Sequence, residues 1–171
     1  MSRHQSRIMG ILCGGGFAVA ALLVYFVVTG PERMSVVTDD SLASADEKWK
    51  SAKIESYRVQ IEVRGRQPAT YEVRVENGKV QAATRNGLPL KQLRTLDTWT
   101  VPGMFYTMSI DMHHQTSHAE GRAEPGEPNV RVRAIFDEQY GYPARYHRTE
   151  FVKRGENPTT SWTVTKFEVL P

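Results

Sequence analysis

The chain has 171 residues, a formal net charge of +3 and a single cysteine, Cys13. Arg3 and Arg7 are two of its 22 basic residues, so residues 31–171 carry 20 basic and 19 acidic side chains, and this balance argues against nucleic acid as a partner. Residues 31–171 contain no cysteine, which excludes disulfides there, and they are numerous enough for one domain with its own core.

Residues 8–28 (IMGILCGGGFAVAALLVYFVV) form an uncharged apolar segment, long enough as a helix to cross a bilayer core of about 30 Å. Arg3 and Arg7 precede it, and positive charge marks the cytoplasmic side. We expect a single-pass protein of the bacterial inner (cytoplasmic) membrane. Its predicted parts are a cytoplasmic N-terminus (1–7), a transmembrane helix (8–28), a tether (29–40) and an extracytoplasmic, periplasmic domain (41–171).

A cleaved signal peptide is the alternative interpretation of this segment. Ala18-Val19-Ala20 has the small-x-small pattern of a cleavage site. Cleavage there would leave Leu22–Val28 as an apolar N-terminus, so an uncleaved anchor is favoured.

Small residues recur along the same segment at Gly10, Gly14 and Ala18, four positions apart. Such a face allows two helices to approach closely in lipid, where packing drives association. It predicts a helix-packing interface, in a homodimer or in a larger complex. The alternative is that glycine is simply common in membrane helices.

The first half of the domain is predicted to be a helix followed by three strands. The helix is expected from a cap at Asp40 or Ser41 to about Ser56, with an apolar face of Leu42, Ala45, Trp49 and Ala52. From Tyr57 the period changes to two, which indicates strands. The apolar positions that alternate are Tyr57, Val59, Ile61 and Val63, then Tyr71, Val73 and Val75, then Val80 and Ala82. Asn77-Gly78 predicts a tight type I′ hairpin, and residues 85–99 are expected to be irregular.

The second half repeats this order. A helix is predicted from a cap at Thr100, with Pro102 in its first turn, to about His114. Residues 119–128 have the composition of a loop, and strands are expected at 130–136, from Pro143 to about Phe151, and at 162–169. In the last strand the apolar positions change phase, from Trp162 and Val164 to Phe167 and Val169, which predicts a bulge.

This element order predicts an α+β domain. Two related α-β-β-β units are expected to form one antiparallel sheet with the helices on one face.

Four motifs, in this order, resemble a family of small uncharacterised bacterial exported or membrane-anchored domains. They are Trp49 with Tyr57, the hairpin VENGKV at 75–80, Thr100-Val101 with Phe105, and Phe136-Asp137 followed by Gly141-Tyr142-Pro143. In the family they read W…Y, V-x-V-x-x-G-K-V, T-V-x-x-L-F and Y-D-x-x-x-G-Y-P. The resemblance covers about residues 42–169 and implies the fold and an exported location, but no catalytic residues. Many relatives carry a cysteine pair after the first strand, whereas Arg64–Ala69 has none.

Asp111, His114 and His118 are the weak candidates for a metal site. At spacings of three and four on one helix they would face the same way and offer Zn²⁺ or Cu²⁺ a carboxylate and two imidazoles. The alternative is a frayed, solvated helix end, and we expect no metal or other cofactor.

Arg131, Arg133 and Arg145, with Arg148 as a fourth candidate, are expected on the outer face of the sheet. Such a stripe suits anionic lipid headgroups or an acidic partner, although it is also typical of a solvated sheet face. Asp137 and Glu138 resemble a carboxylate site, but a turn at Gly141 explains them without chemistry.

We find no nucleophile, phosphate-loop or dinucleotide motif and expect no enzymatic activity. The favoured function is a non-catalytic accessory subunit that braces a larger bacterial membrane complex, photosynthetic or respiratory, with integral membrane subunits and the lipid bilayer as partners. The alternative is a membrane-tethered ligand- or peptide-binding module with an apolar groove between helices and sheet.

Overall fold

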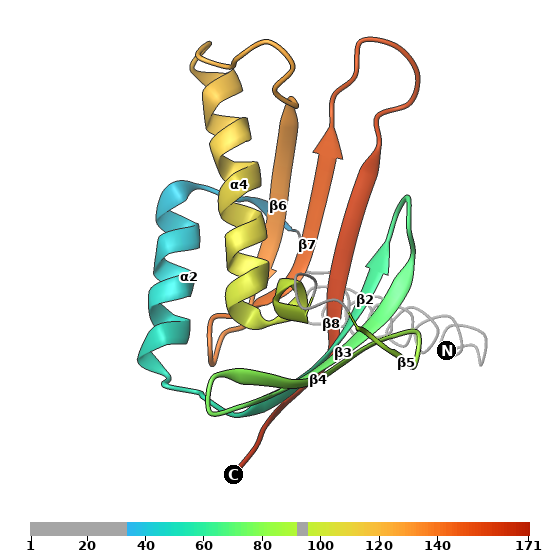
Figure 1. Ribbon diagram of the computed structural model, residues 1–171. Coiled ribbons are helices and arrows are strands. Elements are labelled where there is room, and N and C mark those ends of the chain that lie inside the picture. Colours follow the sequence, from blue (N-terminus) through green and yellow to red (C-terminus); the bar gives the residue numbers. More distant parts are fainter. Residues whose placement is uncertain (1–33, 92–95) are drawn as a thin grey trace, which may run out of the picture. The chain divides into compact units, whose positions relative to one another are not determined.

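The computed structural model describes residues 34–91 and 96–171, which form an α+β domain of two α-helices and one eight-stranded antiparallel sheet (Figure 1). The expected anchor and its residues Gly10, Gly14 and Ala18 lie outside the described residues. Within 34–91 and 96–171, no helix has both the length and the apolar character to cross a membrane.

Each α-helix is followed by three long strands. The first part comprises β1 (Ser35–Val36), α2 (Asp39–Ser51), β2 (Tyr57–Arg64), β3 (Ala69–Glu76), β4 (Lys79–Arg85) and β5 (Leu88–Pro89). The second comprises the 3₁₀-helix η1 (Asp97–Trp99), α4 (Val101–Ala119), β6 (Val130–Phe136), β7 (Pro143–Glu150) and β8 (Thr159–Val169).

The two halves join in the middle of the sheet, whose order is β1-β6-β7-β8-β2-β3-β4-β5. β2 pairs with β3 on one side and with β8 on the other. Figure 1 shows α2 and α4 next to each other on the same face of this sheet, as the sequence predicted.

The alternation predicted for the strands that became β2 and β3 is confirmed. Tyr57, Val59, Ile61 and Val63 are all buried in β2, as are Val73 and Val75 in β3. The bulge predicted in the last strand is also present, because Gln60 pairs with Lys166 while Ile61 pairs with Val164. The extra residue, Thr165, keeps Phe167 and Val169 on the same face as Trp162 and Val164.

The cap predicted for the first helix is wrong by two or three residues. Thr38 caps α2, since its hydroxyl accepts a hydrogen bond from the amide of Ser41 at 3.2 Å, and the Ser41 hydroxyl accepts one from the amide of Thr38 at 2.9 Å. The helix also ends earlier than predicted, at Ser51. Lys53 has a φ of 50°, a left-handed conformation that turns the chain toward β2.

The second helix begins as predicted, with the Thr100 hydroxyl accepting a hydrogen bond from Gly103 at 3.0 Å. It continues five residues beyond His114, to Ala119, because its last turns make tertiary contacts. The side-chain amide of Gln115 donates to the carbonyl of Val37 at 3.1 Å and accepts from the amide of Val132 at 2.8 Å.

Two segments expected to be irregular contain short edge strands. In the predicted tether, Ser35–Val36 forms β1 against β6, and Leu88–Pro89 forms β5 against β4. A register shift in β4 also moves the buried position from the predicted Ala82 to Ala83. These differences arise from strand pairing, which local alternation does not specify.

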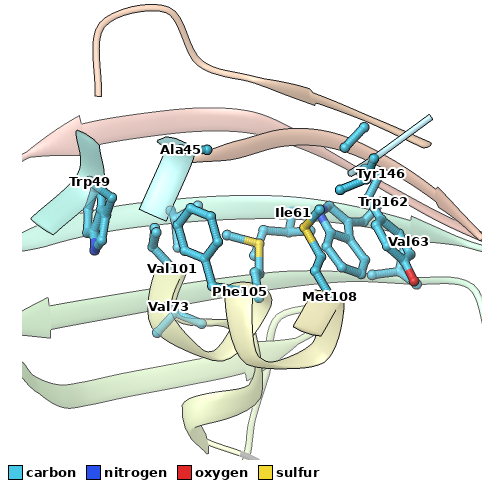
Figure 2. Packing of buried hydrophobic residues seen from close by; sticks show 14 of the residues in the cluster. Ala45, Trp49, Ile61, Val63, Val73, Val101, Phe105, Met108, Tyr146 and Trp162 are labelled. Atoms are coloured by element: carbon cyan, nitrogen blue, oxygen red, sulfur yellow. The ribbon is translucent and has the colours of Figure 1, made fainter. Parts of the chain in front are cut away.

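The core lies between the helices and the sheet. Figure 2 shows Val101, Phe105 and Met108 of α4 directed at the sheet, with Trp49 of α2 at one end of the cluster and Trp162 of β8 at the other. All five side chains are buried, so the predicted core role of both tryptophans is confirmed.

Candidate functional site

Asp111, the first of the three candidate metal ligands, is buried in α4 and makes polar contacts with β7. Its Oδ2 accepts a hydrogen bond from the Tyr146 hydroxyl, and its Oδ1 accepts one from Arg148 Nε at 3.0 Å. Arg148 also donates from Nη1 to Glu150 Oε2 at 2.8 Å. The carboxylate therefore belongs to a chain of polar groups that joins helix and sheet.

The two histidines of that prediction lie elsewhere. His118 Nε2 is 3.0 Å from the carbonyl oxygen of Glu127, so this ring holds the loop after α4. His114 lines a separate hollow with Glu127 and Arg122. Among residues 34–91 and 96–171, no three His, Cys, Asp or Glu side chains are grouped in a way that would hold a metal ion. Asp111, His114 and His118 are therefore not brought together.

The environment of Asp111 keeps its two partners protonated. Burial, together with the negative charge of Asp111 and the hydrogen bond to it, raises the pKa of Tyr146 far above its usual value. Burial lowers the pKa of Arg148, but the hydrogen bonds and charges of Glu150 and Asp111 outweigh this and raise it overall. The phenol therefore remains a donor and the guanidinium remains charged.

A groove of about 770 Å³ runs along α4 next to this cluster. Its walls come from the end of α2, the β3–β4 hairpin, η1 and the first half of α4. Its apolar lining is formed by Trp49, Ile54, Tyr57, Val75, Val80, Pro102, Tyr106 and Ile110. Tyr106 and Ile110 are 69 % and 42 % exposed, which is high for large apolar side chains.

Hydrogen bonds fix the walls of this groove. The Tyr57 hydroxyl accepts a hydrogen bond from the first amide of α4, that of Val101, at 3.0 Å. The amide of Gly78 donates to the carbonyl of Glu55 at 2.8 Å, which holds the β3–β4 hairpin against the segment that follows α2. Asn77 and Gly78 have φ values of 49° and 72°, as the type I′ prediction requires.

A smaller pocket of about 210 Å³ is also lined by Asp111. Trp99, Tyr146 and Trp162 supply aromatic walls, and Thr160 and Arg148 also line it. The rings of Tyr146 and Trp162 stack with centroids 3.7 Å apart, and Trp99 meets Trp162 edge to face at 5.8 Å. These contacts pack the aromatic walls against one another.

The groove and the aromatic pocket share three lining residues, Thr98, Thr107 and Asp111. The two hollows therefore adjoin along one side of α4, and the carboxylate of Asp111 stands at their junction. Of the described residues that line the groove, two carry a negative charge, Asp97 and Asp111, and none is Lys, Arg or His.

Arg131, Arg133 and Arg145 are exposed on the sheet face opposite the helices. Arg133 pairs with His147 and Arg145 with Ile135, positions that alternate with the buried Val132, Ala134 and Tyr146. The prediction that Arg148, the fourth candidate, shares this outer face is wrong. Arg148 pairs with buried Val132 and so lies on the helix side, where it binds Asp111.

The acidic pair at Asp137 is explained by a turn, as predicted. Asp137 Oδ1 accepts hydrogen bonds from the amides of Gln139 at 3.0 Å and Tyr140 at 2.7 Å, and Gly141 has a φ of 82°. This carboxylate organises the β6–β7 connection.

The sequence prediction missed Trp99, Tyr106 and the pairing of Asp111 with Tyr146. The signal available for Asp111 was its position on the apolar stripe of a predicted helix, where a charged residue needs a buried polar partner. The partner, 35 residues away, depends on the register between β6 and β7, which periodicity does not supply.

A family model described as "Family of unknown function (DUF6174)" matches residues 41–147. No curated protein and no solved structure matches the chain.

Proposed function

The chain belongs to the DUF6174 family, whose function is unknown, and we propose from the geometry of its own groove that the protein is a non-catalytic module that binds a small ligand with an apolar body. In this proposal residues 8–28 tether the module to the bacterial inner membrane, and the module lies on the periplasmic side.

The observation that carries the proposal is the groove along α4. A volume of about 770 Å³ is in the range of ligand sites in proteins, roughly 300–1,000 Å³. Its lining is mostly aliphatic and aromatic, with a few hydroxyls and carboxylates, and this composition is also typical of such sites. Tyr106 and Ile110 expose apolar surface to water there, and a bound ligand would remove it.

The test uses 3-phenyl-1-propanol, a neutral and water-soluble probe with an apolar body. The full-length chain is placed in phospholipid nanodiscs, and binding is followed by isothermal titration and by tryptophan fluorescence, since Trp49 lines the groove. We expect saturable binding beyond that of empty nanodiscs. Ile110→Asn should weaken it about threefold to tenfold, because apolar contact is lost.

Val152→Asn is the matched control. Val152 is 38 % exposed, close to the 42 % of Ile110, and does not line the groove. This variant should bind like the native chain. Absence of saturable binding, or equal loss in both variants, would contradict the proposal.

A second candidate is the accessory subunit of a larger membrane complex, photosynthetic or respiratory, that packs through Gly10, Gly14 and Ala18. Its support in the domain is the exposed sheet face that carries Arg131, Arg133 and Arg145, a positive patch suited to an acidic subunit surface or to anionic lipid. Gentle solubilisation from the native membrane, followed by mass measurement, tests it.

The accessory-subunit proposal expects a particle much heavier than one chain, and a lone monomer would contradict it. Changing all three arginines of the patch to glutamine should release the chain from the particle. The same change at Arg66, Arg122 and Arg154, which are exposed elsewhere, should leave the particle intact.

A further inference from the structure

We infer that the ligand of the groove carries a positively charged nitrogen, an ammonium or quaternary ammonium group, which is bound at Asp111 where the groove meets the aromatic pocket. The inference rests on the proposed function, since it names the class of ligand for the same groove.

The charge of the lining is the first argument. Asp97 and Asp111 are the charged side chains among the described residues of the groove. In the aromatic pocket the positive charge of Arg148 is balanced by ion pairs to Asp111 at 3.0 Å and to Glu150 at 2.8 Å. The charged residues among the described lining of the two hollows are Asp97, Asp111 and Arg148, with a net charge of −1, so a cation entering the junction meets attraction.

Asp111 also has acceptor capacity to spare. A carboxylate has about four lone-pair positions, and Asp111 receives one hydrogen bond on each oxygen. Asp111 lines both hollows, although it is only 8 % exposed, so a ligand group that reaches it leaves most of its water behind. An ion pair is stronger in such a place than at an open surface.

The aromatic walls supply the second interaction. Trp99, Tyr146 and Trp162 line the pocket. One face of each ring is stacked on another ring, Tyr146 on Trp162 and Trp99 on Tyr71, and the other electron-rich face of such a ring attracts cations. Figure 2 shows Tyr146 and Trp162 together at the same end of the core. Methylated ammonium groups combine charge with apolar surface, and aromatic walls of this kind recognise them.

The volumes of the two hollows indicate which part of the ligand each one holds. The aromatic pocket, at about 210 Å³, is smaller than a site for a whole drug-sized ligand, whereas the groove, at about 770 Å³, is large enough. The cationic head group is therefore assigned to the aromatic pocket and the apolar body to the groove.

The test compares two probes with the same body, (3-phenylpropyl)trimethylammonium and neutral 3-phenyl-1-propanol. Both are titrated into the full-length chain in nanodiscs, with empty nanodiscs subtracted. All three tryptophans of the chain line one of the two hollows, so their fluorescence reports binding in either. The cation should bind about tenfold more tightly than the alcohol.

Asp111→Asn should reduce that preference, the ratio of the two affinities, to about twofold. Asp40→Asn, at an exposed position in the first turn of α2, is the matched control and should keep the tenfold preference. Trp99→Leu, at a partly exposed position, provides a second variant if Asp111→Asn fails to fold, and should lower the preference about threefold.

The outcomes separate the two proposals. Equal affinity for both probes would overturn the cation inference and leave the binding module standing. Tighter binding of the alcohol would also overturn the cation inference. It would indicate that the site selects a hydrogen-bond acceptor, and the unpartnered indole N–H of Trp162 is a donor for such a group. Binding of neither probe would overturn both proposals. If every variant kept the preference for the cation, the role of Asp111 would be overturned.

Discussion

Asp111 illustrates at the scale of one residue how this domain accommodates a buried charge. Removing a carboxylate from water costs several kcal/mol unless hydrogen bonds and an opposite charge compensate. Tyr146 and Arg148 supply both, from a strand that the helix covers. These two hydrogen bonds hold the carboxylate between helix and sheet, the placement that the proposed cation site requires.

Tyr57 is expected to make the stability of the domain depend on pH in the alkaline range. Burial raises the pKa of Tyr57 to about 12, although the hydrogen bond from Val101 opposes the shift. The folded state therefore holds a proton that the unfolded state releases near pH 10, so stability is complete below pH 10 and falls as pH rises toward 12. Urea denaturation between pH 8 and pH 11.5 should show this fall.

Tyr57→Phe should reduce the alkaline loss of stability by on the order of 1–2 kcal/mol. The substitution also removes the acceptor of the Val101 amide, which lowers stability at every pH. The change in stability of the variant is therefore measured relative to the stability of the same variant at pH 8. A slope against pH identical to that of the native chain would show that Tyr57 does not contribute.

At the scale of elements, local patterns and tertiary contacts determine different things. The Thr100 cap and the Asn77-Gly78 turn depend on neighbouring residues, and both were predicted correctly. The end of α4 depends on Gln115, which bonds to Val37 and Val132 on two other segments. No window of sequence around His114 contains that information.

Gly141 links two elements and gives the second prediction. It has a φ of 82°, and a Cβ there would lie 2.5 Å from the carbonyl oxygen of Ala45 and 2.9 Å from Lys48 Cβ in α2. Gly141→Ala should therefore destabilise the domain by about 2–4 kcal/mol, combining backbone strain with the clash. Chemical denaturation measures the loss.

Gly155→Ala separates these two causes. Gly155 has a similar φ, 89°, but a Cβ there would meet nothing within 4 Å. We expect about 1 kcal/mol from strain alone. If the two variants lose the same stability, the turn does not pack against α2 in the way the structure shows.

At the scale of the whole molecule, β2 and β8 make the two halves one sheet. The apolar side chains of β2 pack beneath both the first-half and second-half helices, in a single core. We therefore expect the described domain to unfold in one cooperative transition.

Ile61, fully buried in β2, tests this. Ile61→Ala should destabilise the domain by about 2–5 kcal/mol and lower the protection of β3 and β7 amides equally in hydrogen exchange. Glu62→Gln, on the solvent side of the same strand, should change stability by less than about 0.5 kcal/mol. Loss of protection in one half alone would contradict a single cooperative unit.

The sequence by itself determined the α+β class, the six long strands, the bulge near Thr165 and the family, because alternation and turn residues act over a few neighbours. Only the tertiary structure decided that Arg148 lies beneath α4 with Asp111 and not on the outer face, where Arg131, Arg133 and Arg145 lie as predicted. Strand register sets those positions, and register depends on pairing between segments far apart in the chain. The groove has the same origin, because its walls come from both halves of the domain, whereas the aromatic pocket is lined by η1, α4, β7 and β8 of the second half.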